Sequence, residues 1–176
     1  SVGRYYGEQN LLRWFNTYEL ASDTTSTFGM DLNRETFGQS SSYDLTRNTN
    51  GYFGGLSHKI QKWDFQGNFR TDSVKVSNVK SSGVTASSST NTNSTLLGAG
   101  YQFSDVWRLS ATSSSGFRAP NAYEISLSPT LAVETHNSQE IGLSYAVENT
   151  LFRTNYFTST TKNAITANSS FTAYTN

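Results

Sequence analysis

The chain has 176 residues, enough for one domain, and its 13 basic residues balance 13 acidic ones, so no net charge draws it towards nucleic acid. It contains no cysteine, which excludes a disulfide framework, and no apolar run approaches the roughly 18 residues of a helical membrane span. Only 35% of the residues are hydrophobic while 14% are aromatic, and Ser, Thr, Asn and Gly are abundant. This balance is typical of a sheet with one apolar face and one wet face.

Alternation of apolar and polar residues predicts antiparallel β-strands along most of the chain. In the clearest run, Trp63, Phe65 and Phe69 share one side of the strand. Asp64 and Arg70 lie on the other side, which no dry protein core would accept. Eight such runs are expected as strands, at about residues 12–20, 28–37, 52–60, 62–72, 97–103, 107–112, 139–147 and 151–160.

The connections between these strands alternate in length. Short ones are expected at 21–25, 61, 104–105 and 148–149, and long loops at 38–50, 73–93 and 116–136. Residues 87–93 are a low-complexity Ser/Thr/Asn tract, interpreted as part of a surface loop. Short turns at one rim and long loops at the other are typical of an outer-membrane barrel. The clean runs also approach the roughly 9–11 residues that a tilted strand needs to cross the hydrocarbon layer.

In a barrel wall the alternation predicts which medium each side chain meets. Aromatic residues near strand ends would form the girdles that such barrels place at the membrane interfaces. The residues expected to face lipid are Trp14, Trp63, Phe65, Phe69, Tyr101, Phe103, Trp107, Leu109, Ile141, Leu143 and Tyr145. Those expected to face the lumen are Arg13, Glu19, Asp31, Asp64, Asn68, Arg70, Arg108, Glu140 and Arg153.

The stretch around the last long loop also carries a family likeness. A strand end with Phe-Arg-Ala-Pro leads to a Leu-x-x-Glu element and then to a Glu-x-Gly strand. The residues concerned are Gly116, Phe117, Arg118, Ala119, Pro120, Glu134, Glu140 and Gly142. In this order they resemble the barrel of TonB-dependent outer-membrane receptors, and residues 16–20, 29–35 and 69–73 resemble upstream strands of those barrels. One departure is Val133, where the family usually has Pro.

The resemblance implies a transmembrane β-barrel of the bacterial outer membrane. It implies a receptor that takes up a scarce nutrient, such as vitamin B12 or a ferric siderophore, with energy supplied through TonB. Outer-membrane lipid or lipopolysaccharide would surround it, and nucleic acid would not be a partner. Family members have about 22 strands and an amino-terminal plug. Residues 1–176 are interpreted as one barrel region without a plug, an internal portion of a receptor that does not transport alone.

Enzymatic chemistry is not expected. His58 and His136 have no metal-ligand neighbours at useful spacing, and charged residues on alternating strands are interpreted as wall charges. No cofactor, metal site or catalytic residue is therefore predicted. Two alternatives to the receptor remain: an autonomous, closed eight-stranded barrel with a structural or adhesive role, and a soluble Ser/Thr-rich β-sandwich.

Overall fold

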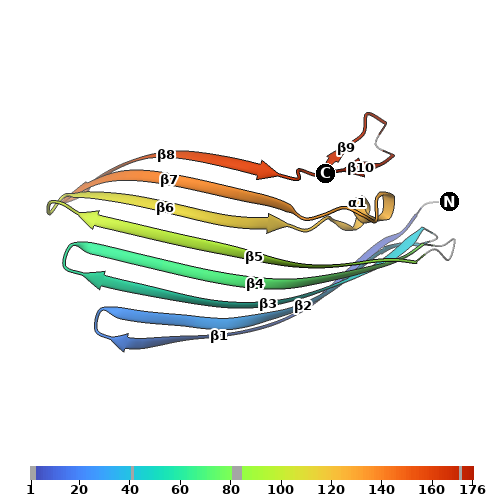
Figure 1. Cartoon of the computed structure of the whole chain (residues 1–176), viewed down its shortest axis with the longest axis horizontal. Coiled ribbons are helices and arrows are strands. Elements are labelled where there is room, and N and C mark those ends of the chain that lie inside the picture. The colour runs from blue at the N-terminus through green and yellow to red at the C-terminus, as the bar shows by residue number, and fades with distance from the viewer. Residues whose placement is uncertain (1–2, 41, 81–84, 171) are drawn as a thin grey trace.

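A computed structural model describes residues 3–40, 42–80, 85–170 and 172–176. Eight antiparallel strands pair in chain order to form one sheet (Figure 1). They are β1 (Tyr5–Ala21), β2 (Thr24–Gln39), β3 (Tyr43–Ile60), β4 (Trp63–Lys80), β5 (Thr85–Gln102), β6 (Trp107–Arg118), β7 (Glu134–Val147) and β8 (Thr150–Lys162). The predicted all-β antiparallel architecture with eight strands is confirmed. None of the described helices is long and apolar enough to cross a membrane.

The strands are longer than alternation predicts, and two of the expected loops are wrong. Most of 38–50 belongs to β2 and β3, which pair residue by residue from Gln39↔Tyr43 onwards. Most of 73–93 belongs to β4 and β5, and 87–93 pair with β4 along their whole length; residues 81–84 lie outside the described part. Hydrophobic alternation reports a strand only where one face is apolar. At these strand ends the face that carries Trp63 and Phe65 becomes polar, and the few apolar side chains, such as Val74 and Val76, lie on the opposite face, so the alternation is interrupted while the backbone pairing continues.

The third expected loop is only partly a loop. Gly116–Arg118 belong to β6 and Glu134–His136 to β7, and a short helix, α1 (Ala122–Leu127), lies between them. Its N-cap is Asn121, whose side-chain oxygen accepts from the Glu124 backbone N–H at 2.9 Å, while the Glu124 carboxylate accepts from the Asn121 N–H at 2.7 Å. A helix of six residues is too short to show a 3.6-residue period. Two further short strands, β9 (Thr166–Ala167) and β10 (Tyr174–Thr175), pair after β8.

Cross-strand register separates the side chains onto two faces, because paired residues point to the same side. One face carries an apolar belt that starts at the short turns and ends, strand by strand, at Leu12, Leu32, Tyr52, Phe69, Leu97, Ala111, Ile141 and Tyr156. On all eight strands the next residue on that side, away from the short turns, is polar. This face is called the belt face, and the opposite one the polar face.

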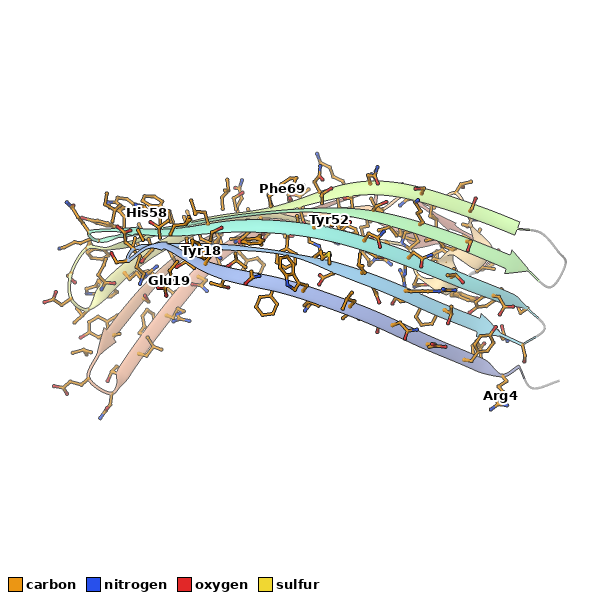
Figure 2. The ribbon with its side chains drawn as sticks, turned by 90° about the horizontal axis from the view of Figure 1, so that it is seen from below. Arg4, Tyr18, Glu19, Tyr52, His58 and Phe69 are labelled. Carbon is orange, nitrogen blue, oxygen red and sulfur yellow. The ribbon has the colours of Figure 1, made fainter. Side chains whose placement is uncertain are left out.

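The belt is exposed in this chain. Tyr156 is 74% exposed and Phe65 44%. The small buried core lies elsewhere, at the rim opposite the short turns, which is called the loop rim. There Leu45, Val74 and Val76 of the polar face pack against Ile125 of α1. Figure 2 shows the sheet arched, with side chains standing on both of its faces. Because β9–β10 is the only other sheet among the described residues, a two-sheet sandwich is not the fold.

The sheet is open. β1 and β8 each pair on one side only within the described part of the chain, and they do not pair with each other. The chain therefore does not close by itself into an eight-stranded barrel in this structure, and it forms an arc of a wall (Figure 1).

Candidate functional site

An ion-pair network crosses four strands on the polar face. The Arg13 Nε donates to Asp31 Oδ1 at 2.6 Å, and the Arg70 Nη1 donates to Asp31 Oδ2 at 2.7 Å. Arg70 also donates from Nη2 to Asp72 Oδ1 at 2.6 Å. The Asp72 side chain is only 1% exposed, so its charge is satisfied within the protein. The network ties β1, β2 and β4 together across β3.

Gly51 makes this crossing possible. It lies on β3 in register with Asp31 on one side and Asp72 on the other. A Cβ at this position would collide with the Arg70 guanidinium and with the Asp72 carboxylate, so the arginine occupies the space above the glycine. Arg70 also lies 5.8 Å from the centre of the Phe53 ring, which leaves its guanidinium between two acids and an aromatic face.

The same arrangement occurs nearer the short turns. Arg108 of β6 donates to the Asp64 carboxylate of β4 at 2.5 Å, and its guanidinium fills the space over Gly100 of the strand between. Lys59 approaches the same carboxylate at 3.8 Å. An arginine reaching over a glycine to a carboxylate two strands away is thus a repeated brace of the polar face. From the sequence, Asp72 is interpreted only as one of the wall charges, and Gly51 and Gly100 have no assigned role, because the pairing of each glycine with an acid on the neighbouring strand leaves no local signal.

All residues predicted to face the lumen fall on the polar face, but the structure brings only some of them together. Arg13, Asp31 and Arg70 form one network, and Asp64 and Arg108 form another. Within the described chain, Glu19, Glu140 and Arg153 take part in none of the ion pairs. The residues predicted to face lipid lie on the belt face, except that Phe103 follows the end of β5 and stacks near Trp107 at 6.4 Å. The register fixes the shared faces; the medium that each face meets remains a prediction.

The family-like block forms a second cluster, at the loop rim. Arg118, the last residue of β6, donates to Glu124 of α1 at 3.0 Å and to Glu134 of β7 at 3.2 Å. The Glu134 carboxylate also accepts from the Ile165 N–H at 3.0 Å, and His136 Nε2 lies 2.9 Å from it. Arg118 therefore joins the end of one strand, the helix and the start of the next strand.

The loop that carries α1 is held onto the polar face by two further contacts. Arg47 donates to the Pro120 carbonyl at 3.2 Å and to Glu35 at 2.8 Å. Phe117 and Ala119 pack against the small core beside Ile125. Gly116 has open space where a side chain would be, while Asn155 and Ser110 lie over Gly142. Glu140 and Gly142 are therefore placed apart from the cluster around Arg118.

Electrostatics at this rim favour the charged forms. Glu134 lies beyond the border of the apolar belt on β7, which ends at Ile141. The Ile165 backbone N–H and then the Arg118 guanidinium lower the pKa of its carboxyl below the usual value. Glu134 thus stays ionised and keeps Arg118 in place at neutral pH.

The two histidines serve separate local contacts. His58 lies on the belt face, with Nδ1 2.8 Å from the Thr24 hydroxyl, and His136 lies at the rim beside Glu134. The described residues contain no group of three or more His, Cys, Asp or Glu side chains that could hold a metal ion. The polar face is a braced wall, with arginines held in fixed positions.

Comparison with known proteins identifies the family. A family model described as "TonB dependent receptor-like, beta-barrel" matches residues 1–176. The chain belongs to the TonB-dependent receptor β-barrel family. Members of this family are outer-membrane transport proteins and not enzymes. This chain is accordingly part of the wall of a β-barrel in the bacterial outer membrane. No curated protein sequence matches it.

Solved structures of such receptors share the fold. The FrpB iron transporter from Neisseria meningitidis superimposes with a TM-score of 0.79 at 17% identity, over 97% of this chain and 30% of that one. A copper transporter, OprC, gives 0.85 at 15% identity, over 99% and 33%. The ferric yersiniabactin uptake receptor FyuA from Yersinia pestis gives 0.69 at 16% identity, over 93% and 30%. The chain spans about a third of the length of each of these structures.

The first testable prediction concerns the space above Gly51. Gly51→Val should lower the free energy of unfolding by about 1–3 kcal/mol, because the new side chain displaces Arg70 from Asp31 and Asp72. Gly54→Val, in the same strand, is the matched control: the nearest atom to its Cβ is the Thr27 carbonyl oxygen at 3.9 Å. Unfolding in urea, in detergent or lipid, measures both. Equal effects of the two substitutions would disprove the brace.

The second prediction concerns the rim. Arg118→Gln removes the charges that hold Glu124 and Glu134, so the backbone amides of 119–133 should exchange with deuterium about tenfold faster. Arg153→Gln removes an arginine of the same face that forms no ion pair in the described chain, and it should leave that exchange unchanged. Unchanged protection in Arg118→Gln would show that the apolar contacts of Ile125 and the Arg47–Pro120 hydrogen bond hold the loop without Arg118.

Proposed function

We propose that this chain forms part of the wall of a receptor that imports a scarce nutrient, a ferric siderophore or vitamin B12, across the outer membrane. The observation that carries the proposal is the family match over residues 1–176. Iron, copper and ferric yersiniabactin appear in the names of structural neighbours, which supports a metal or metal chelate as the transported class. The energy is proposed to come through TonB.

The polar face suits a passive wall. Arg70 and Arg108 are neutralised by carboxylates two strands away, and Arg13 and Arg47 by carboxylates of a neighbouring strand, so these arginines brace the sheet. A wall alone supplies neither a gate nor an energy coupling. We therefore propose that this chain by itself does not transport.

Transport gives the direct test. The receptor that contains this wall is expected to take up labelled ferric siderophore or cobalamin in cells with an energised inner membrane, and to lose uptake when TonB is deleted. The chain alone, reconstituted in liposomes, is expected to take up neither. TonB-dependent uptake by residues 1–176 alone would contradict the wall role, and failure of cells to import any metal chelate or cobalamin would contradict the proposed substrates.

The orientation of the wall is tested on β4. The belt face is proposed to meet lipid and the polar face the lumen. Phe65→Arg puts a charge into the belt and should cost about 2–4 kcal/mol of folding free energy in a bilayer, whereas Asn68→Arg on the polar face should cost little. Reversible folding into lipid vesicles measures both values. Equal costs would refute the assignment of the two faces.

A further inference from the structure

The belt face carries three exposed cations that form no ion pair within the described chain: Arg34 of β2, Lys75 of β4 and Lys162 at the end of β8. Arg34 and Lys75 lie close together, whereas Lys162 lies four strands away from Lys75. On the polar face, five arginines contact carboxylates and Arg153 does not; the five are Arg13, Arg47, Arg70, Arg108 and Arg118. Because no carboxylate of the described chain neutralises Arg34 or Lys75, an anion from outside the chain could bind them without displacing an internal partner.

The sheet register aligns these two cations with amide side chains. Asn10 of β1 pairs with Arg34, Arg34 with Asn48 of β3, and Asn48 with Lys75. All four side chains therefore point from the same face along one line across four strands. Arg34 and Lys75 are separated by one intervening strand, a spacing of about 10 Å. That spacing is too wide for one small ion and suits a headgroup with more than one anionic group.

The level of this line relative to the belt matters. On the belt face, Arg34 is the first residue beyond Leu32, the last apolar residue of the belt on β2. Lys75 is the third residue beyond Phe69 on β4, because the belt border steps along the strands, so Lys75 lies further from the belt than Arg34 does. A hollow of about 400 Å³ lies beside Arg34, with Leu12 and Leu32 on its apolar side and Asn10, Arg34, Asn48 and Asn50 on its polar side. A ligand in it would meet amide and guanidinium donors above and aliphatic side chains below. Among membrane components, a phosphorylated lipid has a matching structure, with an anionic headgroup above and acyl chains below.

One nearby acid has to be taken into account. Glu8 lies one outward position beyond Asn10 on β1, and its carboxylate accepts from the Asn10 amide at 2.8 Å. It makes no ion pair with Arg34. The net charge of the line remains positive, and the side-chain amides of Asn48 and Asn50 form no hydrogen bond with the part of the chain that the structure describes.

We propose that Arg34, Asn48 and Lys75 bind the phosphorylated headgroup of an outer-leaflet lipid, whose acyl chains lie on the belt below. The proposal rests on the lipid-facing orientation of the belt face proposed above. It also places the rim opposite the short turns on the extracellular side, because outer-membrane barrels have short turns on the periplasmic side. It assigns the belt face a specific lipid site, in addition to its general contact with the bilayer. In the outer leaflet, the lipid with more than one phosphate on its headgroup is lipopolysaccharide, which carries these phosphates on sugars.

The test uses the receptor purified from outer membranes in a non-ionic detergent. Bound lipid is counted by native mass spectrometry, and affinity is then titrated with bis-phosphorylated lipid A. The double variant Arg34→Gln/Lys75→Gln is expected to bind about tenfold less tightly or worse, because each cation near a membrane surface contributes to anionic lipid binding. Lys62→Gln/Arg153→Gln removes the same charge at a short turn and on the polar face, and should bind as the unaltered protein does.

Further arms keep the outcome interpretable. Arg34→Lys/Lys75→Arg keeps both charges and should retain binding, which separates a charge effect from a folding defect. Dephosphorylated lipid A should bind weakly to every variant, and inorganic phosphate at millimolar concentration should not compete. Equal binding by the Gln variant, equal binding of dephosphorylated lipid, or displacement by inorganic phosphate would each overturn the proposal. Uptake by the same samples reports on the transport function separately, because neither residue lies on the polar face.

Discussion

The structure depends on one constraint: in a bilayer, every backbone N–H and C=O must find a partner within the protein. An antiparallel meander meets it strand by strand, and here each of the seven neighbouring pairs from β1–β2 to β7–β8 runs in continuous register, with one irregularity near Glu19. Because backbone hydrogen bonds make the strand pairing, the side chains on the two faces can differ in polarity. The belt face is apolar from the short turns to the belt border and polar beyond it, while the opposite face holds charges.

The charges on the polar face obey a second constraint, which is steric. Side chains on neighbouring strands stand about 5 Å apart, so a guanidinium reaches a carboxylate two strands away only if nothing rises between them. Gly51 and Gly100 clear that space. Each glycine weakens its own strand slightly, and the ion pairs that it admits join three strands at once. This explains why Gly51 and Gly100 lie inside long strands and not at turns.

How far the sequence predicts this structure follows from the same two constraints. The eight strands, their order and the faces of Trp63 and Asp64 are predictable, since the belt imposes alternation that can be seen in the sequence. The strand extensions beyond the belt are not, since the belt face turns polar there and the few apolar residues, such as Val74 and Val76, lie on the opposite face, so the alternation is interrupted. The brace at Gly51 depends on residues that only register brings together. The Asn121–Glu124 capping box is a local signal for α1 in the sequence.

The two edges show where the wall must continue. The unpaired sides of β1 and β8 cannot face hydrocarbon, since each free backbone group there would cost several kcal/mol. Their side chains agree: Leu11 and Phe15 of β1 and Leu151 and Phe157 of β8 are exposed apolar residues on the otherwise polar face. Apolar residues on a wet face are stable only when another surface covers them. Both edges therefore require neighbouring polypeptide, for the backbone in the plane of the wall and for these side chains on the polar face.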